Sequence, residues 1–293
     1  MVDNRSAKPL EEEQLRASLS FNLRLLREPN LGLTWARVAG IQAAQADLLV
    51  FADDDNYLLP DYLEQAASIA AREPRIGHFG GIAMPLYQEP IAKWQHRFLA
   101  SVGVRDNGPE PITARHNWWG PWEPIGAGMV TRRPIADRFV QFVRQSRAAQ
   151  LLGRKGSRLM SGEDTLLARI AVDLGYACSY QPALRLFHFI RSRRLRPTVL
   201  ARTLIGHGRS HVVLEELSRR PIYRSGYRKT LWQLARWGPR RIREDGFPAG
   251  LIQWCWDWGF FLQLNNRAPA ADPGWMPEPV AAGEENTGNT AAS

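Results

Sequence analysis

The feature that most constrains the fold is an apolar segment of strand length that runs directly into three carboxylates. Residues 48–52 (LLVFA) are followed by Asp53, Asp54 and Asp55. Because burying an unpaired carboxylate costs more than a strand gains, we expect the acids where the strand reaches the surface. Alternation along an extended chain puts Asp53 and Asp55 on one side and Asp54 on the other. Two such carboxylates suit a hard divalent cation, although a solvated acidic turn explains the triplet alone equally well.

The first third of the chain alternates between helical and extended patterns. Helices are expected over residues 35–46 and 60–73, and strands over 48–51 and 76–84. This alternation predicts an α/β fold with helices on the faces of a sheet. Ligands of such sheets gather beyond the carboxyl ends of the strands, which is where the acidic triplet falls.

Two more candidate groups follow later in the chain. Glu163 and Asp164 begin a predicted helix, and Ser161 with Asp164 resembles a capping box. A cap explains an acid at this position, but a rigid helix start also suits a general base. His188 shares one face of a predicted strand, residues 184–190, with apolar side chains. Such a histidine is more often a core residue than a ligand, unless it lies near the carboxylates.

The segment between these groups is rich in tryptophan and glycine. Residues 103–122 are predicted to be irregular. Trp118, Trp119 and Trp122 lie in this segment, where indoles either stack on sugar rings or anchor the loop to the core. Gly126 and Gly128 flank an alanine in a segment expected to enter the sheet. They allow either a close backbone approach to a ligand or a bulge.

Charge is distributed unevenly along the chain, which has a net charge of +9. Residues 185–243 hold 16 Arg and Lys against two Glu, and residues 247–264 are rich in aromatic side chains. This part is either a set of solvated helices with an aromatic core or a surface for an anionic membrane. No recognisable nucleic-acid module accompanies the charge, so no nucleic-acid partner is expected. The N-terminal residues do not resemble a signal peptide, no apolar run reaches the ~20 residues of a membrane span, and the two cysteines predict no disulfide framework.

Five motifs in a fixed order resemble the family 2 glycosyltransferases from Asp3 to about His211. They are residues 30–37 (NLGLTWAR), 53–56 (DDDN), 126–129 (GAGM) with the following Arg pair, 162–164 (GED), and His188. The resemblance implies a GT-A fold, which is an α/β fold with a mixed, mainly parallel sheet between helices. Here a C-terminal helical appendage would follow it. It further implies a nucleotide-diphospho-sugar donor, a divalent cation (Mg²⁺ or Mn²⁺) and, usually, inversion at the anomeric carbon.

The resemblance also assigns roles to individual residues. Asp55 would hold the cation, with Asp53 and His188 as further metal ligands. Asp164 would be the base, and Glu163 would orient either this base or the acceptor. The remaining assignments form two groups. The nucleotide-sugar would contact Asp3, Asn4, Arg37, Asp53, Asp54, Gly126 and Gly128. The acceptor, a carbohydrate or lipid-linked hydroxyl compound, would contact Trp118, Trp119 and Trp122.

The expected organisation is a GT-A-like domain over residues 1–215, a basic, Trp-rich helical extension over 216–264 and a disordered tail over 265–293. We expect a cytoplasmic enzyme of cell-surface polysaccharide or glycoconjugate synthesis, and peripheral contact with the inner membrane face stays open. Val38 replaces an asparagine common in the family. The family's first strand and helix are also missing before residues 2–6, so the start is set too late or the chain is a fragment.

Three rival functions remain. The main one is a truncated, non-catalytic GT-A remnant that acts as a binding or structural protein. An aspartyl phosphatase is disfavoured because Tyr57 stands where a small hydroxyl residue is usual and no later lysine motif is evident. A nucleic-acid binder rests on the basic segment alone.

Overall fold

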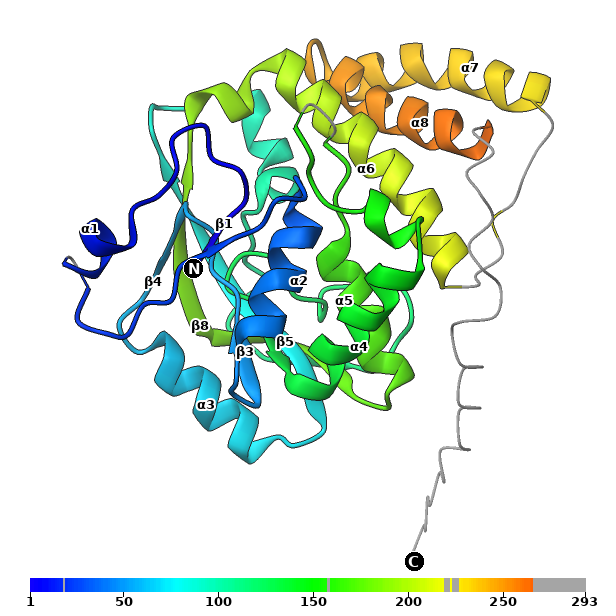
Figure 1. Cartoon of the computed structure of the whole chain (residues 1–293). Helices are drawn as coiled ribbons and strands as arrows, with labels where there is room; N and C mark the ends of the chain where they lie inside the picture. The colour runs from blue at the N-terminus through cyan, green and yellow to red at the C-terminus, as the bar shows by residue number, and fades with distance from the viewer. Residues whose placement is uncertain (18, 157–158, 219–221, 223–226, 266–293) are drawn as a thin grey trace, which may run out of the picture.

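The computed structural model describes residues 1–17, 19–156, 159–218, 222 and 227–265 (Figure 1). Within these residues, eight strands form two sheets: β1 Val2–Asp3, β2 Leu26–Arg27, β3 Leu48–Val50, β4 Asn56–Leu58, β5 Ile76–Tyr87, β6 Ile112–Ala114, β7 Val130–Arg132 and β8 Ala177–Ile190. The predicted disordered tail lies outside the described residues, except for Asn265, which ends the last helix.

Eight α-helices and four 3₁₀ helices surround the sheets in the described part of the chain. The α-helices are α1 Glu12–Arg16, α2 Leu33–Ala43, α3 Tyr62–Arg72, α4 Arg133–Gln145, α5 Glu163–Asp173, α6 Pro197–Leu217, α7 Tyr227–Asp245 and α8 Ala249–Asn265. The 3₁₀ helices are η1 Lys93–Phe98, η2 Ala100–Val102, η3 Ala149–Leu151 and η4 Ser192–Leu195.

The central sheet has the strand order β3-β7-β5-β8-β4, and β6 pairs with β8 beside this path. The two longest strands, β5 and β8, run parallel and pair from Ile76 with Ala177 to Tyr87 with Ile190. β7, β4 and β6 are short and antiparallel to their neighbours. β1 and β2 form a separate parallel pair. The predicted mixed sheet between helices is confirmed, but its parallel part within this sheet is confined to the central β5–β8 pair.

Side chains alternate between the two faces of the sheet along each strand, so an apolar core forms on each face and helices cover both. One apolar core lies between the sheet and helices α2, α4 and α5, with Phe139 of α4 fully buried. A second core covers the opposite face, where Tyr62, Ala66 and Ile69 of α3 pack on Phe79 of β5. Figure 1 shows α3 on one side of the sheet and α2, α4 and α5 on the other.

The C-terminal helices are joined to the sheet by a third apolar cluster, in which Ile190 at the end of β8 meets Leu200 of α6 and Ile252 of α8. Helices α6 and α8 pack closely because glycines face each other across the contact. A methyl group at Gly208 would collide with the Trp256 carbonyl, and one at Gly259 would collide with the Ile205 carbonyl. The predicted helical appendage is therefore packed against the end of the sheet (Figure 1).

Some local predictions were wrong. The predicted irregular segment 103–122 contains β6, because Ile112–Ala114 pairs with the edge of β8. The segment with Gly126 and Gly128 enters the sheet only at Val130, where pairing with β3 and β5 begins.

We predict that Gly208→Ala destabilises the protein by about 1–3 kcal/mol, because the added methyl group overpacks the α6–α8 contact. A glycine-to-alanine change inside a helix otherwise stabilises it by up to about 1 kcal/mol. Gly40→Ala in α2 is the matched control, since its added carbon would lie 3.5 Å from Val2, an ordinary contact. Denaturant unfolding of both variants measures the difference. Equal stabilisation by the two substitutions would contradict the close packing of α6 on α8.

Candidate functional site

The acidic triplet lies in the turn between β3 and β4 rather than on a strand. Asn56 closes this turn, since its side-chain oxygen accepts the Asp53 backbone N–H at 3.0 Å and its own N–H donates to the Asp53 carbonyl at 3.0 Å. Asp54 is exposed, whereas Asp53 and Asp55 are half-buried. The predicted separation of Asp54 from the other two is thus present, but the turn produces it instead of strand alternation.

Strand pairing places Asp55 beside His188. β4 and β8 are antiparallel with Asn56 opposite His188, and the Phe189 N–H donates to the Asp55 carbonyl at 2.8 Å. The Asp55 Oδ1 atom lies 3.4 Å from His188 Nε2. His188 is buried and shares its strand face with Leu186 and Ile190, so the predicted apolar face and the approach to a carboxylate are both observed.

A third group completes this cluster. Arg194 Nη1 lies 3.1 Å from Asp55 Oδ2 and 3.0 Å from His188 Nε2, while its Nη2 donates to the Val102 carbonyl at 3.2 Å. Burial alone would raise the pKa of Asp55. The contacts with His188 and Arg194 outweigh burial and lower that pKa below its usual range. Asp55 is therefore a carboxylate at neutral pH.

The second pair of acids begins α5 in an unexpected way. The N-cap is Gly162, whose φ of 116° suits glycine, and no side chain caps the helix. The predicted capping box of Ser161 and Asp164 is therefore wrong. Asp164 instead accepts the backbone N–H of Gly126 through Oδ2 at 2.9 Å and that of Thr165 through Oδ1 at 2.9 Å. Half-buried and held by two amides, it has a fixed position.

Glu163 turns away from the solvent and forms a buried ion pair with Arg37 of α2. The Arg37 Nη1 to Glu163 Oε1 distance is 2.9 Å, and both side chains are about 5% exposed or less. Burial raises the pKa of Glu163 although Arg37 opposes this, and nearby Asp164 raises it further. Glu163 is thus a group that holds α5 to α2, beside the more accessible Asp164.

Arg37 also connects the two pairs of acids. Burial raises the pKa of Asp53, and Arg37 is the largest opposing influence. A side chain at Gly126 would reach within 2.5 Å of Arg37 Nη2, so the predicted close approach at Gly126 is to this guanidinium. The approach at Gly128 is to Tyr62, whose hydroxyl donates to the Gly128 carbonyl at 2.5 Å.

Two buried titratable groups lie behind Asp164. Glu123 is 2% exposed, and burial raises its pKa to about 7 against the influence of Arg169 and a hydrogen bond with Thr165. His78 is fully buried, its Nδ1 lies 2.7 Å from the Thr131 hydroxyl, and burial lowers its pKa to about 4. His78 is therefore neutral at physiological pH, and Glu123 titrates near it.

Asp3 and Asn4, the two residues at the start of the chain predicted to contact the nucleotide, form hydrogen bonds with nearby backbone groups. Asp3 Oδ1 accepts the Ser6 N–H at 2.8 Å, and this bond lowers the pKa of Asp3. Asn4 donates to the Asn30 carbonyl at 2.7 Å and accepts the Gly32 N–H at 2.7 Å. These bonds fix the end of β1 against the turn that begins α2.

The three tryptophans divide into two kinds. Trp118 and Trp119 are 44% and 65% exposed, whereas Trp122 is half-buried against the first core. Trp118 stacks on the His116 ring at 4.1 Å, and Trp119 lies over the buried guanidinium of Arg105 at 5.8 Å. Trp122 therefore anchors the loop, and the other two indoles present aromatic surface to the solvent.

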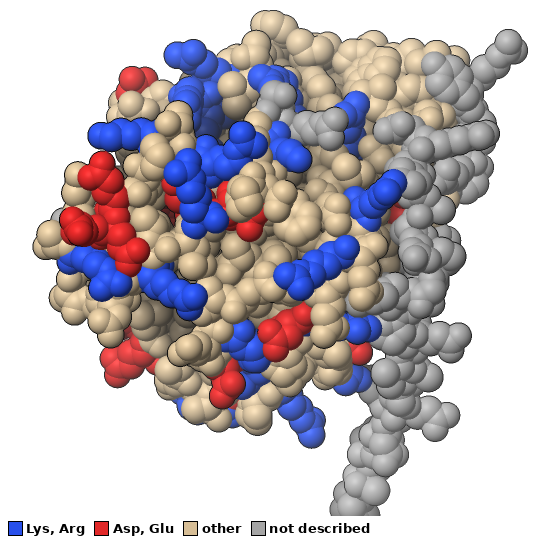
Figure 2. Space-filling model, viewed as in Figure 1, with Lys and Arg blue, Asp and Glu red and all other residues tan. Residues whose placement is uncertain are grey.

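Charged side chains of both signs gather on the face shown in Figure 2, with basic ones most numerous on its upper half. Arg154 acts electrostatically on Asp53, Glu163 and Arg194, so it lies within range of both acid pairs. Among the described residues, no group of three or more His, Cys, Asp and Glu side chains forms a metal-ligand cluster.

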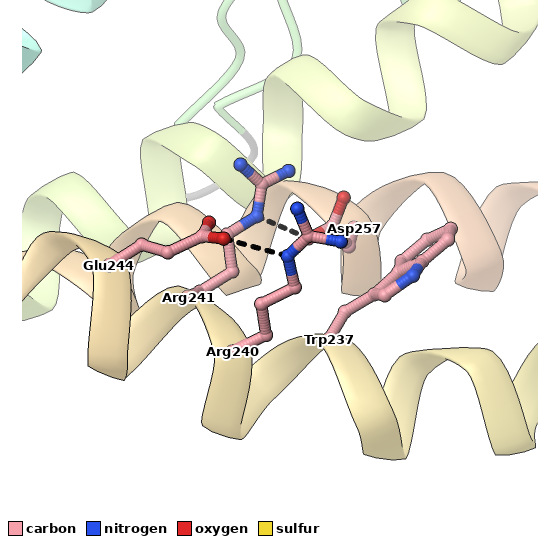
Figure 3. Close-up of a pocket in the computed structure, with 5 residues that line it drawn as sticks. All are labelled: Trp237, Arg240, Arg241, Glu244 and Asp257. Atoms are coloured by element: carbon pink, nitrogen blue, oxygen red, sulfur yellow. Dashed lines mark hydrogen bonds and ion pairs between the residues drawn. The ribbon is translucent and has the colours of Figure 1, made fainter.

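Two surface depressions are lined by residues other than these carboxylates. One, of about 230 Å³, lies between α7 and α8 (Figure 3). Arg240 pairs with Glu244 at 2.7 Å there, and Arg241 with the buried Asp257 at 3.4 Å. The other, of about 510 Å³, is lined by the segments 88–95 and 190–196, including three arginines. Both are consistent with the strongly basic character of the C-terminal part.

Sequence reasoning missed two residues of the site. Arg194 is one of four arginines within residues 191–196, and no local pattern distinguishes it from the others. Glu123 is a buried acid in a loop that is otherwise aromatic and Pro-rich, where acids are usually exposed. Only the fold shows that Arg194 reaches Asp55 and that Glu123 lies behind Asp164.

Comparison with known proteins gives one family match. Residues 1–139 match the glycosyl transferase family 2 model. A search of curated proteins found no match. Among solved structures, a crystal structure of GalNAc-T7 with UDP, GalNAc and Mn²⁺ is similar at 12% sequence identity and a TM-score of 0.49. The match covers 92% of this chain and 51% of that one, so this chain spans about half the length of that protein.

We predict that Glu123 makes the protein less stable as pH rises. Its pKa is raised in the folded state, so the folded protein holds a proton that the unfolded chain releases between the usual pKa of 4.5 and about 7. Stability should fall across this window, by at most about 3 kcal/mol, and level off above it. Glu123→Gln should remove this loss, measured by denaturant unfolding at pH 5 and pH 8.

Glu64→Gln, an exposed acid of α3, is the control for Glu123→Gln. The control should keep the pH dependence of the wild type. If Glu123→Gln kept it as well, the raised pKa of Glu123 would be refuted.

Proposed function

We propose that this chain, whose residues 1–139 match the glycosyl transferase family 2 model, is a glycosyltransferase. It would transfer a sugar from a nucleotide-diphospho-sugar to an acceptor hydroxyl with inversion and with the help of a divalent cation. The observation that supports this most is the relation of the two acid pairs. Asp55 contacts Arg194 and His188, and Asp164 is held by backbone amides. Arg37 forms an ion pair with Glu163 and acts electrostatically on Asp53. This arrangement would hold the proposed cation site and the proposed base on one scaffold.

The donor set at Asp55 fits a divalent cation. Mg²⁺ usually takes only one or two protein carboxylates and completes its shell with water and substrate phosphates. Asp55 offers an ionised carboxylate, His188 offers Nε2 3.4 Å away, and Asp53 is close enough to affect Asp55 electrostatically. We propose that Asp55 and His188 hold the cation with Asp53 nearby. When bound, a cation at this position would stabilise the negative charge that grows on a departing diphosphate.

Asp164 is the proposed general base. An acceptor hydroxyl must lose its proton as it attacks the sugar, and a carboxylate in a fixed position near the reacting atoms performs this step. Asp164 is the more accessible of the two acids that begin α5, and two backbone amides fix its orientation. Glu163 holds Arg37 and thereby positions α5, which makes it a positioning residue.

The proposed substrates follow from the surrounding groups. Arg37 and Arg154 provide positive charge for a donor diphosphate, and exposed Trp118 and Trp119 offer ring faces for a carbohydrate or lipid-linked acceptor. Asp3, Asn4, Asp54, Gly126 and Gly128 keep their proposed place in the nucleotide-sugar site. The proposed pathway is the synthesis of cell-surface polysaccharide or glycoconjugate.

We also propose that the enzyme is cytoplasmic and makes peripheral contact with an anionic membrane through α7 and the α7–α8 turn. Trp232, Trp237 and Phe247 are 59%, 41% and 78% exposed there. Arg236 lies 4.6 Å from the Trp232 ring centre, and Arg243 is exposed on the same helix. Exposed aromatic rings beside arginines suit the headgroup region of an anionic leaflet. No described helix is long and apolar enough to cross a bilayer.

We predict that Asp164→Asn lowers kcat for sugar transfer by about 10²–10⁴-fold, because the amide cannot take the proton of the acceptor. Donor binding should change little, since the substitution keeps the shape of the side chain. Asp137→Asn on the exposed side of α4 is the matched control and should keep wild-type turnover. Transfer assays with a panel of nucleotide-sugars, together with calorimetric donor binding, measure both quantities. Unchanged kcat in Asp164→Asn would refute the assignment of the base, and donor binding without any transfer by the wild type would favour a non-catalytic remnant.

The membrane contact gives a separate prediction. Replacing Trp232 and Phe247 together by alanine should weaken binding to phosphatidylglycerol-containing vesicles several-fold, because both rings lose their apolar contact with the interface. Phe21→Ala removes a ring on the N-terminal part whose exposure, 65%, lies between those of Trp232 and Phe247, and it should bind as the wild type does. Co-sedimentation at low and high salt measures the effect. Absence of wild-type binding to anionic vesicles would exclude the proposed contact.

A further inference from the structure

We propose that Arg194 is a built-in cation that occupies the space between Asp55 and His188 in the metal-free enzyme, and that a divalent cation must displace it to bind. This inference rests on the proposed function, because it concerns the same cation site. It adds a residue to that site: Arg194 would keep the two ligands in place and set the affinity for metal.

The first observation is the position of the guanidinium. Arg194 Nη1 is within 3.1 Å of Asp55 Oδ2 and 3.0 Å of His188 Nε2, the two atoms proposed as metal ligands. One nitrogen thus contacts both ligands, as a bound cation would. A divalent cation and a guanidinium cannot share this space, because both are positive and both need the same lone pairs.

The second observation is how His188 is held. Its Nδ1 lies 3.0 Å from the Gly103 carbonyl, which can only accept, so Nδ1 carries a proton and donates to it. A metal-ligating histidine uses the same arrangement, with one nitrogen fixed by a backbone carbonyl and the other directed at the metal. The Gly103 contact thus directs Nε2 at Asp55 and Arg194, where the cation is proposed to bind.

The third observation is how Arg194 itself is held. It lies in η4, which follows β8 directly, and Nη2 donates to the Val102 carbonyl at 3.2 Å. Its other electrostatic neighbours include Arg154 and Arg193, which repel it, and Asp53, which attracts it. Once a cation takes the Asp55 and His188 contacts, that repulsion favours movement of the guanidinium away from the site. The negative charge of a donor diphosphate would then offset the positive charge of the displaced Arg194 guanidinium.

The test is binding of Mn²⁺ alone, without donor, measured by the electron paramagnetic resonance signal of free Mn²⁺. Arg194→Gln removes the competing cation and leaves Asp55 and His188 intact. Hydrogen bonds to charged groups are strong enough that we expect Mn²⁺ affinity to rise on the order of tenfold or more. Arg194→Lys keeps the charge on a flexible chain and should give an intermediate affinity.

Arg193→Gln is the matched control, because it removes one positive charge from an exposed neighbour and should bind Mn²⁺ nearly as the wild type does. Thermal unfolding provides a second measurement. Arg194→Gln should have a lower Tm than the wild type without metal and a larger rise in Tm when Mn²⁺ is added, whereas a purely structural role would lower both values.

Equal or weaker Mn²⁺ binding by Arg194→Gln would overturn the inference, and so would an equal gain in Arg193→Gln. Neither result would affect the proposed sugar transfer, which is measured separately with the wild type. Absence of Mn²⁺ binding in every variant would overturn the inference together with the cation site, while transfer activity in the presence of a chelator would still identify the enzyme.

Discussion

The site depends on the buried ion pair between Arg37 and Glu163. It joins the helix before the acidic turn, α2, to the helix that carries the proposed base, α5. Removing one partner of a buried pair typically costs about 3–5 kcal/mol, because the other charge is left without compensation. Gly126 has to be a glycine for this guanidinium to lie where it does, and the Gly126 amide in turn holds Asp164. A single buried contact thus helps to position the half-buried Asp164.

Strand β8 makes the second connection. Its alternating side chains bury Leu184, Leu186 and Ile190, and the same alternation directs His188 inward. What makes His188 different is the antiparallel partner β4, which is short because it begins immediately after the acidic turn. The histidine is therefore at once a residue of the apolar face and a neighbour of Asp55. The two explanations that the sequence left open for it, core residue and ligand, are compatible in this fold.

The sequence predicted the α/β class and the helices and strands on either side of the acidic triplet, because hydrophobic periodicity is a local property. The predicted separation of Asp54 from its neighbours is present, but the turn produces it. The sequence did not predict the contacts of side chains far apart in the chain. Ser161 and Asp164 matched a capping box, yet Gly162 with its positive φ is the N-cap and leaves Asp164 free to accept from Gly126. Arg194 and Glu123 could not have been selected, since their importance arises from the approach of segments between roughly 40 and 140 residues apart. Local hydrophobic periodicity determines which helices and strands form, whereas strand pairing and burial determine which side chains meet at the site.

The distribution of charge across the site has a consequence for the order of binding. Asp55, Asp53 and Glu163 each have a positive neighbour before any substrate arrives, namely Arg194 or Arg37. Half-buried carboxylates without such partners would be protonated or would repel one another, as the burial-driven rise in the pKa of Asp53 indicates. In the proposed function, a cation that entered with a diphosphate would exchange one set of paired charges for another and leave the net charge of the region nearly constant. An electrostatically balanced resting state of this kind would favour joint binding of cation and donor over binding of either alone.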